Sequence, residues 1–136
     1  MPPGTSKSPQ PCPGPAPRRL ALIIEDDPNV RLTLELVLIA EGYETLCTDG
    51  SREGLALFQS HHHRLALVAI DYSLPDMDGI EAVAAMRRTA IVPTVIMTGL
   101  DPQSLPAAPL GAAGEFLVML GKPFSIEVFL QAVARI

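Results

Sequence analysis

Short apolar runs alternate along this chain with stretches in which apolar residues recur at helical spacing. This alternation restricts the possible folds more than any other feature. The runs are read as strands, buried on both faces where they are continuously apolar. They cover residues 20–24, 43–47, 65–70, 93–97 and 116–120. Strands that alternate with helices form a parallel sheet with right-handed crossovers and helices on both faces, so we expect an α/β, doubly wound fold.

Three helices between these strands have clear sequence signals. Asp27 followed by Pro28 predicts the start of the first helix, because aspartate caps a helix and proline suits its first position. Gly42 predicts its end. Further helices are expected over residues 51–60 and 79–88, where apolar residues keep a helical period.

The last two helical segments differ in strength. Residues 102–113 contain three prolines, and an interior proline costs a helix about 3 kcal/mol, so this fourth helix is expected to be short, broken or absent. The final helix has a clear cap in Ser125. Its expected apolar face consists of Ile126, Phe129, Leu130 and Val133.

The first nineteen residues have a different composition from the rest. Seven of the fourteen prolines lie within the first seventeen residues, together with glycine, serine and glutamine. Such a segment buries too little apolar surface to order itself, so residues 1–19 are predicted to be a flexible tail and residues 20–136 one folded domain. A Pro-rich segment can also bind an aromatic groove, but composition favours a passive extension.

Charge and cysteine content restrict the partners and the compartment. Fifteen acidic and ten basic side chains give a formal net charge of −5, which disfavours a direct nucleic-acid partner. The apolar runs are far shorter than the roughly 20 residues of a membrane helix, so no membrane association is expected. Cys12 and Cys47 make a poor disulfide framework and fit a reducing compartment. These features predict a cytoplasmic protein.

Carboxylates follow two of the predicted strands. Glu25 and Asp26 come directly after the first strand, and Asp71 follows the third. Ligand sites of open parallel sheets lie outside the carboxyl ends of the strands, so these side chains are expected to converge. Carboxylates so placed repel one another, and Mg²⁺ is the usual remedy. Asp26 and Asp71, with Glu25 directly or through water, are therefore predicted to bind Mg²⁺.

A threonine and a lysine follow the fourth and fifth strands. Lys122 is the only lysine of residues 20–136 and can neutralise the acidic cluster or bind a phosphoryl oxygen. The Thr98 hydroxyl can donate to the same oxygen. Asp71 is then the natural nucleophile for an aspartyl phosphate. Each residue alone also fits an ordinary role, Thr98 as a strand-end residue and Lys122 as a solvated loop charge.

Two further groups of polar residues are not assigned to the site. Asp76 and Asp78 are read as turn formers leading into Gly79. Three adjacent histidines at 61–63 cannot all face one metal ion, so a solvated loop is favoured there.

These residues resemble the receiver domain of bacterial two-component response regulators. The resemblance covers residues 20–136 and depends on four segments in the same order as in that family. They are Glu25-Asp26-Asp27-Pro28, the segment from Asp71 to Gly79, Met97-Thr98-Gly99, and Lys122-Pro123-Phe124.

The resemblance implies a flavodoxin-like (βα)5 fold with strand order 2-1-3-4-5. It further implies that a sensor histidine kinase or phosphotransfer protein phosphorylates Asp71. Glu25, Asp26 and Asp71 would hold Mg²⁺, while Thr98 and Lys122 would contact the phosphoryl group. Such a domain catalyses its own phosphorylation and slow dephosphorylation and is a switch more than a turnover enzyme.

The printed sequence ends at Ile136, so a stand-alone receiver is expected. It would signal by changing conformation and binding a partner when phosphorylated, as the chemotaxis regulators do, or by relaying phosphate onward. The sequence leaves both routes open, and with them the cognate kinase and the target.

The chain departs from the family pattern in two places. The family usually has an aromatic residue three positions before the lysine, where this chain has Met119, and Phe116 lies six positions before. The register of the fifth strand decides which of the two takes that place. The proline-rich fourth helix alters a face through which receivers meet partners.

Two other functions are considered. A phosphohydrolase of the haloacid dehalogenase type is disfavoured, because Ser73 stands where those enzymes have a second aspartate and the acidic pair comes first in the chain. The stronger alternative is a receiver-like interaction module that has kept its acidic pocket but has lost phosphorylation-dependent switching.

Overall fold

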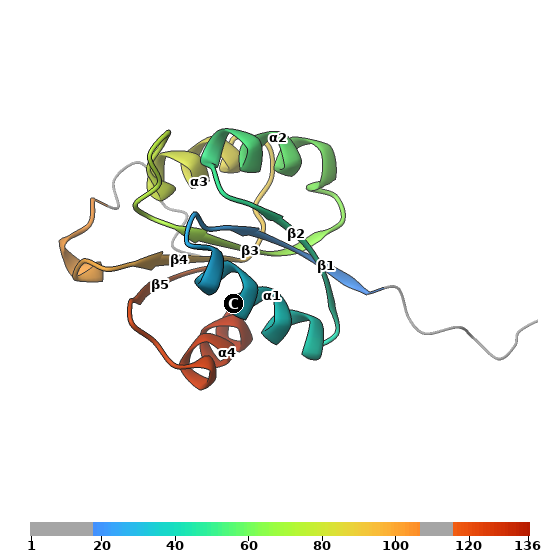
Figure 1. Cartoon of the computed structure of the whole chain (residues 1–136). Helices are drawn as coiled ribbons and strands as arrows, with labels where there is room; N and C mark the ends of the chain where they lie inside the picture. Colours follow the sequence, from blue (N-terminus) through green and yellow to red (C-terminus); the bar gives the residue numbers. More distant parts are fainter. Residues whose placement is uncertain (1–17, 107–115) are drawn as a thin grey trace, which may run out of the picture.

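Five parallel strands form one sheet in the computed structural model, which describes residues 18–106 and 116–136 (Figure 1). The sheet order is β2-β1-β3-β4-β5, as predicted. The strands are β1 (Arg19–Ile24), β2 (Tyr43–Thr48), β3 (Leu65–Asp71), β4 (Thr94–Thr98) and β5 (Leu117–Gly121). The doubly wound, flavodoxin-like architecture is confirmed.

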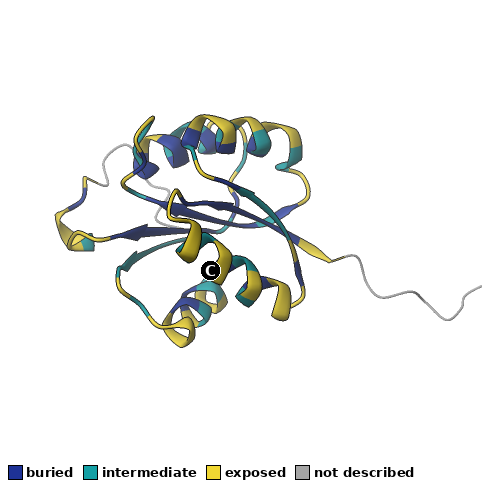
Figure 2. Ribbon diagram, in the orientation of Figure 1, coloured by how far each residue is buried: buried dark blue, intermediate teal, exposed yellow. Residues whose placement is uncertain are grey.

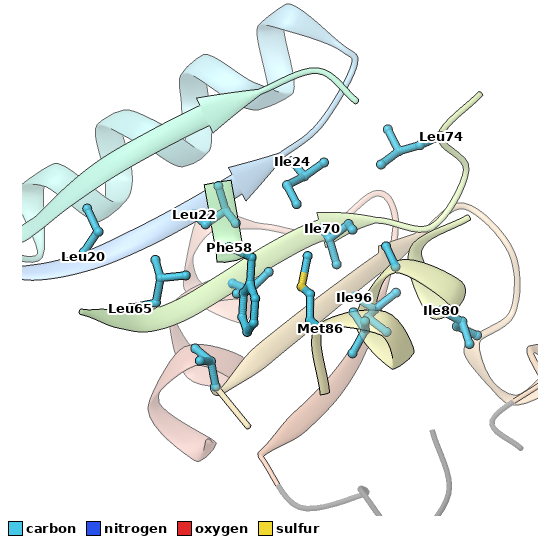
Figure 3. Close-up of a cluster of buried hydrophobic side chains, with 14 of the residues drawn as sticks. Leu20, Leu22, Ile24, Phe58, Leu65, Ile70, Leu74, Ile80, Met86 and Ile96 are labelled. Carbon is cyan, nitrogen blue, oxygen red and sulfur yellow. The ribbon is translucent and has the colours of Figure 1, made fainter. Parts of the chain in front are cut away.

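Helices cover both faces of this sheet (Figure 1). On one face lie α1 (Pro28–Ala40) and α4 (Ile126–Arg135), and on the other lie α2 (Ser51–His61) and α3 (Gly79–Arg87). Each face has its own apolar core, and the central strands are buried on both sides (Figure 2). Phe58 of α2 and Met86 of α3 pack over Ile70 and Ile96 in one of these cores (Figure 3).

Local signals place the boundaries of α1 where the sequence predicts them. The Asp27 carboxylate accepts hydrogen bonds from the amides of Asn29 at 2.9 Å and Val30 at 3.3 Å, and Pro28 is the first helical residue. After the helix, Gly42 adopts a φ of 95°, which a residue with a side chain rarely adopts. This turn leads the chain directly into β2.

The N-terminal boundary of the sheet lies one residue earlier than expected. Arg19 pairs with Tyr43 as the first residue of β1, and the Arg19 guanidinium lies 4.5 Å from the centre of the Tyr43 ring. The remainder of the predicted tail, residues 1–17, lies outside the described residues.

The prolines after β4 have the predicted effect within the described part of that region. Pro102–Ser104 form a single 3₁₀ turn, η2, capped by the Asp101 carboxylate. Residues 107–115, which make up the rest of the expected fourth helix, lie outside the described residues.

The predicted apolar face of the final helix is wrong at one position, Ile126. Phe129 and Ala132 are the buried residues of α4, whereas Ile126 is exposed. Ile126 is the first residue of the helix, three positions before Phe129, the first of its buried residues. It lines an apolar groove between α1 and α4 instead.

The register of β5 is fixed by its pairing with β4. Met119 lies opposite Ile96, and Gly121 lies opposite Thr98. Phe116 precedes the strand, with a φ of 58°, and is exposed. The register therefore keeps Met119, and not Phe116, as the strand residue three positions before Lys122. Met119 is partly buried and packs beside the core shared with α2 and α3.

None of the helices in the described residues is long and apolar enough to cross a membrane.

Candidate functional site

Four strands deliver polar side chains to one edge of the sheet. Asp71 and Thr98 are the last residues of β3 and β4, and both are buried. Glu25 and Lys122 are the first residues after β1 and β5. Because the strands are parallel, their carboxyl ends meet at this edge, so residues up to 97 positions apart in sequence come into contact.

Glu25 is fully buried, yet each of its carboxylate oxygens has a donor. Oε1 accepts a hydrogen bond from Lys122 Nζ at 2.7 Å, and Oε2 accepts one from the backbone amide of Asp27 at 3.1 Å. The backbone carbonyl of Glu25 accepts a hydrogen bond from the Arg31 guanidinium at 2.9 Å. The contacts with Lys122 and the Asp27 amide satisfy a carboxylate that burial alone would strongly destabilise.

Lys122 joins the two buried carboxylates. Its ammonium lies 2.7 Å from Glu25 Oε1 and 3.2 Å from Asp71 Oδ1, and 24% of its side-chain surface is exposed. The backbone amide of Lys122 donates to the carbonyl of Thr98, which ties the end of β5 to the end of β4. The predicted neutralising role of Lys122 agrees with this geometry.

Burial and the ion pair act in opposite directions on the pKa values of Glu25 and Lys122. Burial raises the pKa of Glu25 above its ordinary 4.5, and the charge of Asp71 adds to the rise, while the hydrogen bond from Lys122 opposes it. Burial would lower the pKa of Lys122, but its hydrogen bond to Glu25 and the charges of Glu25 and Asp71 outweigh burial and raise that pKa. Lys122 therefore stays protonated at neutral pH, and Glu25 is the partner that takes up a proton as the pH falls.

The same edge provides a set of oxygen ligands. Carboxylate oxygens of Glu25, Asp26 and Asp71 all lie within 4.8 Å of one another. Asp26 is exposed, whereas Glu25 and Asp71 are buried. A few carboxylates together with an open, solvated side suit Mg²⁺, which keeps several of its waters. The chemistry of this donor set therefore fits the predicted cation.

Thr98 completes the set of polar groups from the four strand ends. Its side chain is buried, and Oγ1 accepts a hydrogen bond from the amide of Leu100 at 3.0 Å. A hydroxyl that accepts one bond still carries a proton that it can donate. The structure thus places all five predicted site residues at one edge of the sheet.

Sequence reasoning missed the role of one residue beside the site. The Asp76 carboxylate accepts hydrogen bonds from the amides of Ser51 at 3.0 Å and Arg52 at 2.8 Å, and so caps α2 from the loop after β3. In return, the Ser51 hydroxyl donates to the carbonyl of Met77 at 2.8 Å. Hydrogen bonds from backbone amides, that of Arg52 foremost, lower the pKa of Asp76. The one available signal was Gly50, which gives α2 no side-chain cap of its own.

The loop ends at Asp78 and Gly79, where α3 begins close to the end of β3. Asp78 caps α3 by accepting a hydrogen bond from the amide of Glu81 at 2.8 Å. A Cβ atom on Gly79 would lie 2.8 Å from the carbonyl oxygen of Asp71 and 2.9 Å from the Cα of Tyr72. Only glycine allows α3 to begin so close to the end of β3.

Comparisons with known proteins agree with this arrangement. A family model described as the response regulator receiver domain matches residues 21–134. Regulatory protein AtoC of Escherichia coli is 37% identical over 115 residues, which cover 84% of this chain and 24% of that protein. Cell cycle transcriptional regulator CtrA of Caulobacter vibrioides is 38% identical over 119 residues, which cover 85% of this chain and 47% of that protein.

The similarity extends to solved structures. The chemotaxis protein CheY4 of Vibrio cholerae superimposes with a TM-score of 0.74 and 27% identity, covering 88% of this chain and 98% of that one. The curated relatives are longer, and the chain spans about half of their length or less.

Proposed function

The chain belongs to the response regulator receiver domain family, and from this premise we propose that it accepts a phosphoryl group on Asp71 from a phosphohistidine. The donor would be a sensor histidine kinase or a histidine phosphotransfer protein. The observation that carries the proposal is the contact of one ammonium, that of Lys122, with both buried carboxylates. Such an arrangement holds a nucleophilic carboxylate beside a cation that can follow the charge to a phosphoryl oxygen.

The transfer makes one bond and breaks one. A carboxylate oxygen of Asp71 attacks phosphorus, the phosphorus–nitrogen bond of the phosphohistidine breaks, and the imidazole leaves with the electron pair. As charge moves from the carboxylate to the phosphoryl oxygens, the Lys122 ammonium follows it, and the Thr98 hydroxyl donates a hydrogen bond to one of those oxygens. Attack of water on the acyl phosphate later returns the carboxylate and inorganic phosphate.

The proposal includes Mg²⁺, held by Glu25, Asp26 and Asp71. When bound, a divalent cation disperses the negative charge that gathers on the phosphoryl oxygens. Glu25 would help to hold the cation, since its buried carboxylate is fixed in place by the Asp27 amide.

A receiver-like interaction module without switching is the second candidate, and the register of β5 favours it. Met119 stands where the family usually has the aromatic residue that couples to the threonine. A methionine side chain is unbranched and adapts to its surroundings, so it is a weak two-state element. In this alternative the pocket accepts phosphate without altering the surface.

The two candidates are separated by combining intact-mass measurement with amide NMR spectra, before and after addition of acetyl phosphate and Mg²⁺. The expected result is a Mg²⁺-dependent phosphoryl adduct, lost in Asp71→Asn and kept in Asp78→Asn, a carboxylate of the same loop that caps α3. Shifts that spread from Thr98 into β5 and η2 indicate a switch, and shifts confined to the pocket indicate the module. Uptake of phosphate by Asp71→Asn would remove Asp71 as the acceptor.

A further inference from the structure

The outward face of α1 is apolar and has no partner among the described residues. Leu32, Leu36 and Ile39 recur at helical spacing on this face and are 53%, 58% and 45% exposed. We call these three residues the α1 stripe. A surface helix normally turns charged residues to solvent, and a helix that is apolar all round is normally covered.

The charged residues of α1 lie beside the stripe, where they already have partners. The Arg31 guanidinium donates to the carbonyl of Glu25, and the Glu35 carboxylate accepts a hydrogen bond from the Thr45 hydroxyl. Both side chains are half-buried as a result. Neither of these charged side chains of α1 is therefore free to keep the α1 stripe hydrated.

The chain enters the domain next to the end of the α1 stripe. Arg18, the first described residue, and Ile39 line the same hollow of about 370 Å³. His61, at the end of α2 on the opposite face of the sheet, lines it too. The segment that precedes Arg18 thus starts between the ends of α1 and α2 and can run along either helix.

Charge favours contact between this segment and the domain, and α1 in particular. Residues 1–17 carry one basic side chain, Lys7, and no acidic one, whereas residues 18–136 carry fifteen acidic and nine basic side chains, a net charge of −6. Between positions 26 and 44, which include α1 and both of its ends, five acidic residues stand against one basic residue, Arg31. Charges of opposite sign steer two such surfaces together.

We propose that residues 1–17 bind within the same chain to the α1 stripe, running from Ile39 toward Leu32. The segment has the necessary length. Cys12 lies six positions before Arg18, about 19 Å at 3.1 Å per residue in an extended proline-rich chain. Ile39 and Leu32 are seven residues apart on a helix, about 10 Å at 1.5 Å per residue.

Composition lowers the cost of this contact. Seven of the seventeen residues are proline, whose ring fixes φ and provides apolar surface. A segment with few free dihedrals loses less entropy when it becomes ordered on a surface. The bound segment covers the stripe, and any protein that binds α1 must displace it.

The test uses the full chain with a nitroxide spin label on Cys12. Cys47→Ala leaves Cys12 as the only thiol, and amide intensities are compared between the oxidised and reduced label. Leu36 and Leu57 provide the internal comparison, because each lies about one helical turn before a residue of the shared hollow, Ile39 or His61. Binding to the stripe predicts loss of the Leu36 and Leu32 amide signals while Leu57 keeps its intensity.

Variants link that asymmetry to the stripe. Leu32→Gln with Leu36→Gln changes two exposed side chains and is expected to restore the amide signals at positions 32 and 36. Ile91→Gln, an equally exposed apolar residue outside α1, is expected to leave the loss unchanged. Equal broadening of Leu36 and Leu57, or loss that persists in the double variant, would overturn the proposal.

A mixed sample excludes a second copy as the occupant. Spin-labelled chain without ¹⁵N is mixed with ¹⁵N-labelled chain that carries no spin label. The proposal predicts no broadening of the stripe in this mixture. If the stripe broadens in this mixture as much as in the sample whose chains carry both labels, the contact is between two chains, and binding within one chain is refuted.

Discussion

Replacing Lys122 by methionine tests the central ion pair of the site. Methionine keeps most of the length of the side chain but removes the ammonium that contacts Glu25 at 2.7 Å and Asp71 at 3.2 Å. Glu25 Oε1 loses its donor, while Oε2 keeps the amide of Asp27. The variant thus leaves two buried carboxylates facing each other with no cation between them.

The loss of stability follows from burial. Removing one partner of a buried pair typically costs 3–5 kcal/mol, because the remaining charge is desolvated and uncompensated. The Lys122 side chain is 24% exposed, so some of its attraction is screened by water. We therefore expect the low end of the range, a decrease of about 3 kcal/mol in the free energy of unfolding at neutral pH without Mg²⁺.

The pH dependence has a definite sign. The pKa of Glu25 is raised in the folded protein above its ordinary 4.5, so the folded state binds this proton more readily than the unfolded state. The contribution of Glu25 to stability is therefore fully present below pH 4.5 and is lost as the pH rises through the raised pKa. Without Lys122 the pKa of Glu25 rises further, so the deficit of the variant shrinks as the pH falls.

The assay is urea unfolding followed by circular dichroism at about pH 7.5 and about pH 5, in Mg²⁺-free buffer. Arg64→Met is the matched control, because Arg64 pairs with Glu44 at 3.1 Å while both side chains are about half exposed. An exposed pair contributes about 0–1 kcal/mol. Equal losses in the two variants, or a Lys122→Met deficit that does not shrink at the lower pH, would refute this account of the site.

Three further predictions concern local features of the fold. Asp76→Ala removes the cap of α2 and should lower the free energy of unfolding by about 1 kcal/mol in urea, whereas Asp101→Ala, which removes only the cap of the three-residue η2, should cost clearly less. Gly79→Ala places a Cβ against two backbone atoms at the end of β3 and should cost about 2 kcal/mol in the same assay, while Gly99→Ala meets no atom within 4 Å and should be tolerated. Burial raises the pKa of Cys47 to about 11, so this thiol should react with iodoacetamide at pH 8 far more slowly than in the urea-unfolded chain, and equal rates would contradict its burial.

The sequence predicts most of the fold because its signals are local. Continuous apolar runs mark the central strands, and the Asp27-Pro28 pair marks the start of α1 by a contact that spans three residues. The place of the candidate site residues was also predictable, since each lies at or just after the end of a strand and the carboxyl ends of parallel strands meet. Neither the fold nor the place of the site residues depends on knowing how remote segments of the chain pair with each other in detail.

Features that depend on pairing between remote segments could not be read from the sequence in the same way. Phe116 and Met119 are both apolar and both suit a strand, so periodicity does not choose between them. The choice is made by the β4–β5 ladder, which places Gly121 opposite Thr98, and by the bond from the Lys122 amide to the Thr98 carbonyl. A one-residue slip would break that bond and turn Met119 to the other face of the sheet.

Asp76 illustrates the same limit in the loop after β3. In sequence it is a turn residue before Asp78 and Gly79, and it fulfils that role. Its two hydrogen bonds to α2 arise only because β1 lies between β2 and β3, which brings the loops after β2 and β3 to the same edge of the sheet. The loop that begins at Asp71 is thus held at Asp76 by the start of α2 and at Gly79 by close packing against β3. In the proposed switch, a phosphoryl group on Asp71 would meet a loop fixed at two points, and the conformational response would pass through the Thr98 side of the site, where Met119 and η2 lie.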